Sequence, residues 1–491
     1  MIVVNRNKAC ERETEPRMDA RRIQLIALSI LLSAMLSLFG NVQPAFAKKQ
    51  ADNDIVAGYT AADRGLSATN LPSITAKSAY VVDSDGNVYF ERNADKEAQI
   101  ASITKVMTCI LAIESADLDK EIKVSERASK IGESSAYLAK GDRLTLKNAL
   151  IGLMVPSGND AACAIAENVG ADFVSNAKAQ GTQILDVDGN PIDLDAKDAG
   201  YNAFVAKMNE KAKEIGMENS VFTNPHGLDI NEFKGEKLHS TARDVSTMSV
   251  YGMQNPTFRE IVSLGDTNIT VKREKKDIKI KLDGTDVLIG TYDGACGIKT
   301  GFTEEAGGCF TGAVERDGKY LYSVVLGASS NDQKFDDSKT IYEWVYGNFV
   351  DFPLANTSQY LQTEDGKDTD VPILAEIPQK DWIDKTVKAT IKDPEQSVKV
   401  NAIFGNVSQT INANEIAGNV KSGDVVGTID YYQGNDLVAS TDLIACEDSD
   451  APNPFESALI AVQRFFGMFS GASASADLLI HNKTEPILLK A

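Results

Sequence analysis

Ser102-Ile103-Thr104-Lys105 opens a segment whose apolar residues recur with helical spacing, at Ile103, Val106, Met107, Ile110 and Leu111. Residues three apart share one face of a helix, so the Ser102 hydroxyl and the Lys105 amine are expected to point into one space. A serine nucleophile beside an amine base is a known variant of the serine–base pair. Ser175 and Lys178 have the same spacing but no such apolar stripe, so the rest of the chain must favour one copy.

The composition excludes several classes of function. The chain has 491 residues with 43% hydrophobic content and a formal net charge of −20, which predicts two or three folded domains and disfavours nucleic acid as a partner. Its only histidines are His226, His239 and His481, too few for a histidine-based metal site or a Ser-His-Asp triad. We therefore expect a lysine base, with no metal and no cofactor.

Cysteine usage is sparse. Cys10 precedes the export signal described below, and five cysteines remain: Cys109, Cys163, Cys296, Cys309 and Cys446. An odd number cannot all pair internally, and no Cys-x-x-Cys metal spacing occurs. Cys296 and Cys309 flank an expected hairpin, and whether they form a disulfide stays open at this point.

The beginning of the chain has the pattern of a secretory signal. Arg21-Arg22 precede an apolar run over 23–39, and Ala45-Phe46-Ala47 gives a small-x-small cleavage site. We predict a signal peptide over 1–47, with the start at Met1 or Met18 left open, and a flexible leader over 48–73. The protein is expected outside the cytoplasm, at the outer face of the bacterial cytoplasmic membrane or in the cell wall.

The next part of the chain predicts an α+β domain over 74–350. Strands are expected at 78–83 and 88–90, helices at 103–111, 144–154, 159–167 and 204–217, then strands at 297–301, 309–314 and 320–326 and a helix at 340–349. Asp317-Gly318 predicts a tight turn. Residues 175–200 form an acidic insertion, in which Asp186–Asn190 favours a turn over a calcium loop because the EF-hand glycine and glutamate are missing.

Two further parts follow this domain. Residues 351–370 are polar and predict a linker, and alternating short strands over 371–447 predict a small all-β domain. The tail, 448–491, contains an amphipathic helix with its apolar stripe at Phe455, Leu459, Val462, Phe466 and Phe469. The stripe fits a membrane surface or this protein's own surface equally well.

Three motifs occur in order along the chain: Ser102-x-x-Lys105, Ser157-Gly158-Asn159 and Lys299-Thr300-Gly301. Ser329-Ser330-Asn331 and Lys421-Ser422-Gly423 imitate the last two. Of the possible combinations, only the set with Ser102, Ser157 and Lys299 has the first motif at an expected helix start, the second between two expected helices and the third on an expected strand before a hairpin. Each motif alone could occur by chance. Their order along the chain and their expected structural contexts together distinguish this set from the imitations.

With these motifs the chain resembles the penicillin-binding proteins and serine β-lactamases. It is more similar to the low-molecular-mass D-alanyl-D-alanine carboxypeptidases of the peptidase S11 type, through Asn224-Pro225-His226-Gly227-Leu228, Ser240-Thr241-Ala242-Arg243-Asp244 and the all-β domain with its amphipathic tail. The resemblance covers about residues 74–470. It implies a β-lactamase/transpeptidase-like catalytic domain, an antiparallel sheet with a helical subdomain, followed by the small all-β domain and the C-terminal helix.

The resemblance also implies an activity: removal of the terminal D-alanine from peptidoglycan stem peptides ending in D-Ala-D-Ala, with β-lactams as inhibitors. Ser102 would be the nucleophile, Lys105 the base and Ser157 the proton relay. The remaining implied roles are amide binding by Asn159, carboxylate binding by Lys299 and Thr300, close approach at Gly301, and an oxyanion hole from the backbone N–H groups of Ser102 and Phe302. His226 and Arg243 match family positions near the site, where a structural role, such as an Arg243–Asp244 pair, is an equal alternative.

Two rival functions are left open. A class A β-lactamase would add a deacylating glutamate, yet no Glu-x-x-Leu-Asn pattern lies between Asn159 and Lys299, and Gly158 stands where aspartate is usual. A non-catalytic cell-wall binding protein could keep the same fold. The intact motif side chains favour the enzyme.

Overall fold

The structure is a computed structural model that describes residues 51–229, 237–362, 370–470 and 473–490. The predicted signal peptide, 1–47, lies outside the described residues. Within them, no helix is both long enough and apolar enough to cross a membrane.

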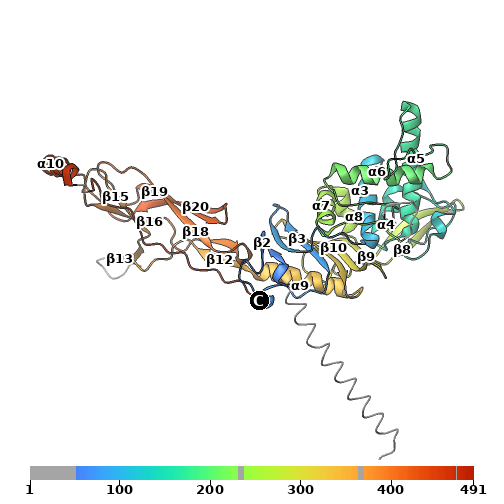
Figure 1. The fold of residues 1–491 in the computed structure, drawn as a ribbon, viewed down its shortest axis with the longest axis horizontal. Helices are drawn as coiled ribbons and strands as arrows, with labels where there is room; N and C mark the ends of the chain where they lie inside the picture. Colours follow the sequence, from blue (N-terminus) through green and yellow to red (C-terminus); the bar gives the residue numbers. More distant parts are fainter. Residues whose placement is uncertain (1–50, 230–236, 363–369, 471–472, 491) are drawn as a thin grey trace, which may run out of the picture. The chain divides into compact units, whose positions relative to one another are not determined.

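A seven-stranded antiparallel sheet forms the centre of the catalytic part, in the order β2-β1-β4-β3-β11-β10-β9 (Figure 1). Its strands are β1 (Ile55–Val56), β2 (Tyr59–Thr60), β3 (Ser78–Asp83), β4 (Val88–Arg92), β9 (Ala295–Thr303), β10 (Gly307–Arg316) and β11 (Lys319–Ala328). The predicted strands around 80, 88, 299, 311 and 323 are confirmed, as is the tight turn at Asp317-Gly318, which joins Arg316 to Lys319. The third motif therefore lies on β9, at the edge of the sheet.

Helices cover both faces of this sheet. Thr311 on β10 shares a hydrogen bond with Ser249 on α7 (Ala242–Met253), whereas the next residue, Gly312, faces the Tyr342 hydroxyl on α9 (Gln333–Gly347). Consecutive strand residues point to opposite faces, so α7 and α9 lie on opposite sides. This layering confirms the predicted α+β class.

A helical subdomain lies on the α7 side. It contains the 3₁₀ turn η2 (Ala101–Thr104) and the helices α3 (Lys105–Ser115), α4 (Leu146–Met154), α5 (Asn159–Gln180), α6 (Ala199–Glu214) and α8 (Pro256–Val262). It also contains the 3₁₀ turn η3 (Ala128–Lys130) and a four-stranded sheet, β5 (Glu121–Lys123), β6 (Arg143–Thr145), β7 (Thr267–Arg273) and β8 (Lys276–Leu282). α3 is buried from Lys105 to Ala112, which makes it the central helix of this subdomain. α5 runs well beyond the predicted end at 167.

The flexible leader predicted over 48–73 is wrong for the residues that follow Asp54. β1 pairs with β4, Val56 is fully buried, and the Asp54 carboxylate accepts hydrogen bonds from the Arg92 guanidinium. The remaining 3₁₀ turn of this region is η1 (Ala68–Asn70). A strand of two residues is too short to show a periodicity, and β1 is stabilised by its partner β4, more than 30 positions later.

The all-β domain contains a six-stranded sheet in the order β18-β19-β20-β16-β15-β21. The strands are β15 (Ala375–Pro378), β16 (Thr386–Ile391), β18 (Val407–Ala413), β19 (Val425–Gln433), β20 (Asp436–Ala445) and β21 (Leu479–Ile480), with the 3₁₀ turn η4 (Ala402–Phe404). Two further pairs are β12 (Phe349–Pro353) with β17 (Ser397–Asn401) and β13 (Tyr360–Leu361) with β14 (Val371–Pro372). The predicted linker, 351–370, thus begins inside β12.

The amphipathic helix is present as α10 (Pro454–Ser470), but the chain does not end as a free tail. β21 pairs with β15, Asn482 donates to the Leu354 carbonyl at 2.9 Å, and the Lys490 N–H donates to the Asn348 side chain at 2.7 Å. The prediction of 448–491 as a tail is therefore wrong after residue 478. The returning segment is short, and its contacts are with partners far away in the sequence.

Candidate active site

Ser102 and Lys105 are brought together by the junction of η2 and α3. The Lys105 Nζ donates a 2.8 Å hydrogen bond to the Ser102 Oγ, and the Lys105 side chain has no exposed surface. Ala101, directly before the serine, has a φ of 47°, a conformation that costs a non-glycine residue free energy and recurs at functional sites. The backbone here is held in an unfavourable conformation that directs Ser102 toward the amine.

The segment 224–228 closes around the same lysine. The Lys105 Nζ donates a second hydrogen bond, 2.7 Å long, to the His226 carbonyl, and the Thr108 hydroxyl donates to the neighbouring Pro225 carbonyl at 2.7 Å. Gly227 has a φ of +86°, and a Cβ there would lie 1.9 Å from the Ala101 carbonyl oxygen. Only glycine fits this contact, which explains the need for Gly in Asn-Pro-His-Gly-Leu.

Burial sets the protonation of Lys105. Removal from water lowers the pKa of its amine from 10.5 to about 7, against the opposing influence of Cys163, Asp160 and Glu133. A neutral amine accepts a proton and an ammonium does not, so the surroundings of Lys105 favour the form of the amine that can accept a proton near neutral pH.

The second motif lies in the short connection between α4 and α5. Ser157 is 4% exposed and has a φ of 63°, again an uncommon conformation for a residue with a side chain. The Asn159 Nδ2 donates to the Gly132 carbonyl at 3.0 Å, whereas the Asn159 Oδ1 is buried without a hydrogen-bond partner among the described residues. A buried acceptor left without a partner is costly, and it is available to a ligand's N–H group.

Asp160 holds the loop that faces this motif. Its carboxylate accepts hydrogen bonds from the Ala136 N–H, the Leu138 N–H and the Ser135 hydroxyl, at 2.8, 3.0 and 2.7 Å. The sequence identified Asp160 only as a residue of a helix start. Its hydrogen bonds to the loop at 135–138 could be identified only from the structure, because that loop is more than 20 residues away in the sequence.

The third motif approaches the serine from β9. The Lys299 side chain is buried, and its Nζ donates to the Thr300 carbonyl at 3.0 Å. Burial, followed by the positive charges of Lys105 and Lys334, holds the pKa of the Lys299 amine well below its ordinary value. The Thr300 and Thr285 hydroxyls share a 2.8 Å hydrogen bond.

Gly301 and Phe302 complete this strand. A Cβ on Gly301 would lie 2.9 Å from the Ile100 carbonyl oxygen and 3.2 Å from the Ser102 nitrogen, so the close approach is to the turn that carries the nucleophile. Phe302 follows with its side chain 42% exposed. Because β9 is an edge strand, alternate backbone groups of this segment face away from the sheet and are available to an extended ligand.

His226 and Arg243, the two possible supporting residues, make different contacts in the structure. His226 is fully buried and contacts Lys105 through its backbone carbonyl rather than its imidazole. The Arg243 guanidinium bonds to Asp95, Glu91 and the Tyr80 hydroxyl, which fits the structural role that the sequence left open. The Arg243–Asp244 pair is wrong, since the Asp244 carboxylate accepts hydrogen bonds from Asn219 and Ser220.

The imitating motif at Ser175 lies on the exposed face of α5, where the Ser175 hydroxyl donates to the Ala171 carbonyl and Lys178 pairs with Asp195. The predicted turn in the insertion is confirmed, with the Asp186 N–H donating to the Asn190 carbonyl. In the described part of the chain, no cluster of three or more His, Cys, Asp or Glu side chains is arranged to bind a metal.

The five described cysteines are free thiols. Cys309 pairs with Gly301 across the β9–β10 ladder, whereas the neighbour of Cys296, Ala295, pairs with Val314. Cys296 and Cys309 therefore lie at different ends of the hairpin, too far apart for the disulfide left open above.

Two buried charged groups near Lys299 were missed by sequence reasoning. Lys334 on α9 is 3% exposed, and burial lowers the pKa of its amine to about 8. Asp286 lines a small cavity with Lys299 and Thr300, and its Oδ2 is buried with no hydrogen-bond partner among the described residues. Neither residue falls in a recognisable motif, so only the packing against β9 reveals them.

Comparisons with known proteins found several similar to this chain. A family model described as D-alanyl-D-alanine carboxypeptidase, Peptidase_S11, matches residues 66–185 and 195–330. The chain is 28% identical over 381 residues to the D-alanyl-D-alanine carboxypeptidase DacF of Bacillus subtilis (strain 168), covering 76% of this chain and 85% of the relative. It is also 28% identical over 301 residues to the D-alanyl-D-alanine carboxypeptidase of a Streptomyces strain, K15, covering 59% and 94%. The crystal structure of the Streptomyces K15 DD-transpeptidase matches 55% of this chain and 97% of its own, with 27% identity and a TM-score of 0.48.

Proposed function

The chain belongs to the D-alanyl-D-alanine carboxypeptidase family of serine peptidases, and on that premise we propose which group performs each step. The enzyme removes the terminal D-alanine from peptidoglycan stem peptides ending in D-Ala-D-Ala, through an acyl-enzyme on Ser102. One observation carries this proposal: the 2.8 Å hydrogen bond between the Ser102 Oγ and a fully buried Lys105 amine. It places nucleophile and base in contact in a site that favours the neutral base.

Acylation begins with attack of the Ser102 Oγ on the carbonyl carbon between the two D-alanines, while the Lys105 Nζ takes the hydroxyl proton. The backbone N–H groups of Ser102 and Phe302 stabilise the oxyanion that forms. The proton then passes through the Ser157 hydroxyl to the leaving amine, the C–N bond breaks, and D-alanine departs. In the second half, water adds to the ester with Lys105 again as base, and the shortened peptide leaves Ser102 regenerated.

Recognition of the substrate is assigned to the groups that surround the serine. The peptide lies along the free edge of β9, where the Thr300 hydroxyl and the Lys299 amine meet the terminal carboxylate, whose negative charge favours the protonated amine. The unpartnered Asn159 Oδ1 accepts the N–H of the penultimate peptide bond. A β-lactam presents the same carbonyl and carboxylate, so it acylates Ser102 as an inhibitor.

Release of D-alanine from a pentapeptide ending in D-Ala-D-Ala tests this function, with Ser102→Ala as the comparison. We expect release by the wild type and a loss of at least ~1000-fold in the variant, because removing the nucleophile abolishes the covalent route. Undiminished release by Ser102→Ala contradicts the proposal. Rapid turnover of penicillin instead of a long-lived adduct would favour the β-lactamase, and no reaction with either compound would favour a binding protein.

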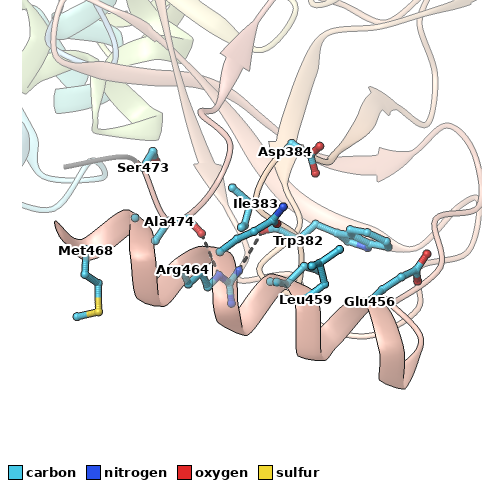
Figure 2. Close-up of a pocket in the computed structure, with 12 residues that line it drawn as sticks. Trp382, Ile383, Asp384, Glu456, Leu459, Arg464, Met468, Ser473 and Ala474 are labelled. Carbon is cyan, nitrogen blue, oxygen red and sulfur yellow. Dashed lines mark hydrogen bonds between the residues drawn. The ribbon is translucent and has the colours of Figure 1, made fainter. Parts of the chain in front are cut away.

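We also propose that the enzyme acts outside the cytoplasm, in cell-wall biogenesis, and touches the membrane surface through α10. The side of this helix that faces the all-β domain is fixed by buried Ile460 and by Arg464, whose guanidinium donates to the Lys380 and Trp382 carbonyls. Figure 2 shows Arg464 reaching from α10 to the backbone of Trp382 and Ala474. α10 is therefore attached to the domain by one face only.

The other face of α10 is apolar and exposed. Phe455, Phe466 and Phe469 are 80%, 66% and 78% exposed, and Phe465 and Met468 extend the same surface. A helix with one face attached and phenylalanines on the other suits insertion into the headgroup region of a bilayer.

Sedimentation with liposomes of bacterial lipid composition tests this contact. We expect the wild type to sediment with the vesicles and the double variant Phe466→Asp/Phe469→Asp to stay in solution. Leu437→Asp is the matched control, because Leu437 is an exposed apolar residue of β20, outside α10. Equal sedimentation of the wild type and the double variant contradicts the proposal.

A further inference from the structure

The imidazole of His226 is held from several directions. The Leu228 N–H donates to the His226 Nδ1 at 3.2 Å, and the His226 Nε2 lies 3.3 Å from the Tyr201 hydroxyl. Since Nδ1 accepts a hydrogen bond, the proton of the neutral ring is on Nε2, and Nε2–H donates to the Tyr201 oxygen. Burial and the positive charges of Lys105 and Arg127 lower the pKa of this imidazole to about 3, which agrees with a neutral ring.

The backbone of the same residue is held as well. The His226 N–H donates to the Asn224 Oδ1 at 3.2 Å, and its carbonyl accepts the 2.7 Å hydrogen bond from Lys105. The contacts with Asn224 and Leu228 are local to the segment 224–228. The contact with Tyr201 comes from a separate element, α6, and so fixes the segment relative to the helical subdomain.

Tyr201 is itself buried at the start of α6. It lies in the first turn of this helix and is 1% exposed. The guanidinium of Arg127, from the residue before η3, stacks 3.7 Å from the centre of the Tyr201 ring. Both side chains line a groove of 890 Å³ between the start of η3, α5 and the end of the insertion. Arg127 and Tyr201 therefore line this groove, and Tyr201 also contacts His226.

We propose that Tyr201 is a positioning residue for the catalytic lysine, acting through His226. The Tyr201 hydroxyl fixes the His226 ring, the ring fixes the peptide unit that carries the His226 carbonyl, and that carbonyl orients the Lys105 Nζ toward the Ser102 Oγ. Arg127 holds the tyrosine ring in place by covering its face. The inference rests on the proposed function, because it assigns Lys105 as the base.

This arrangement predicts which kinetic constant changes. The Tyr201 hydroxyl acts on the base and not on the groups assigned to the substrate, so its loss slows acylation and leaves binding unaltered. Replacing it by Tyr201→Phe keeps the ring under Arg127 and removes the hydroxyl that contacts the His226 ring. We expect kcat for D-alanine release, and the first-order rate of penicillin acylation, to fall about 3- to 10-fold, with KM within about 2-fold of wild type.

The matched control is Tyr251→Phe. The Tyr251 hydroxyl donates to Glu114 at 2.7 Å from α7, so this variant also loses one tyrosine hydrogen bond, without a contact to His226. We expect its kcat to stay at the wild-type value. Equal kcat values for Tyr201→Phe and wild type, with Ser102 acylated normally in both, overturn the positioning role and leave the proposed function standing. Absence of acylation at Ser102 in the wild type overturns the proposed function instead.

A spectroscopic readout separates positioning from a general loss of stability. The chain has three histidines, so long-range ¹H–¹⁵N spectra contain three imidazoles, assignable through His239→Gln and His481→Gln. We expect the wild-type His226 signals to show the Nε2–H tautomer throughout pH 5–8, and Tyr201→Phe to shift its Nε2 signal. An Nδ1–H tautomer in the wild type, or an Nε2 signal unmoved by the substitution, contradicts the inference even if the melting temperature falls.

Discussion

The protonation of Lys105 makes the strongest quantitative prediction. With a pKa of about 7, the amine is neutral in about half of the molecules at pH 7 and in about 1% at pH 5. At its ordinary pKa of 10.5 the neutral fraction at pH 7 would be only about one in 3000. Acylation needs the neutral amine, so the second-order rate with penicillin should rise about 50-fold from pH 5 to pH 7 and reach a plateau above pH 8.

Glu133→Gln is the perturbation that tests the cause. The Glu133 carboxylate raises the pKa of Lys105, and its removal should therefore move the acidic limb of the rate profile to lower pH, with the plateau unchanged. Glu274→Gln removes an exposed carboxylate from the connection between β7 and β8 and is the matched control, with no expected shift. The assay is stopped-flow acylation by a chromogenic penicillin from pH 5 to pH 9. A rate independent of pH, a limb near pH 10, or a shift of Glu133→Gln to higher pH refutes the reasoning.

Three other substitutions test the surroundings of the site. Asp160→Ala should lower the free energy of unfolding by about 2–4 kcal/mol in a urea titration, because it leaves two buried N–H groups without an acceptor; a loss below ~0.5 kcal/mol contradicts its role. Gly301→Ala places a Cβ 2.9 Å from the Ile100 carbonyl oxygen, so the turn that carries Ser102 must shift. Penicillin acylation should slow about 10- to 100-fold and the melting temperature should fall, and an unchanged rate is the opposing result. Burial raises the pKa of Asp286 to about 6, and the ionised Asp286 carboxylate in turn raises the pKa of the Lys299 amine. Asp286→Asn should therefore weaken peptide binding more at pH 8, where Asp286 is ionised, than at pH 5, whereas equal weakening at both values contradicts this electrostatic role.

The sequence predicted the parts of the fold that have strong local signals. The stripe after Ser102 specified a buried helix, and the alternating apolar runs around Lys299 specified adjacent strands joined by tight turns. These elements bring their own residues into the core, so spacing alone identifies them. The contact between Ser102 and Lys105 follows from the same local geometry.

Elements stabilised mainly by distant partners were not predictable. β1 has two residues and exists because β4 lies beside it, and β21 exists because β15 does. The same limit applies to the site, where Asp160, Asp286 and Tyr201 act through contacts with loops and strands remote in sequence. A single aspartate or tyrosine is not part of any sequence pattern that would distinguish it from a surface residue. Only its contacts in the folded protein reveal its role.

The Arg243–Asp244 ion pair that the sequence left open does not form, for a related reason. A family position near the site suggested a supporting role, and the adjacent Asp244 suggested an ion pair. Adjacent residues on a helix lie about 100° apart and do not face each other. Arg243 instead reaches Asp95 and Glu91, and Asp244 caps a different segment.

The central claim is that Ser102 forms the acyl-enzyme with Lys105 as its base. Intact-mass analysis and peptide mapping after reaction with penicillin test it most directly, in the wild type and in Lys105→Arg, which keeps a cation but cannot act as a base near neutral pH. We predict a single adduct on Ser102 in the wild type and none in Lys105→Arg on the same timescale, with both proteins folded. An adduct on another serine, or equal labelling of Ser102 in both proteins, would contradict the account.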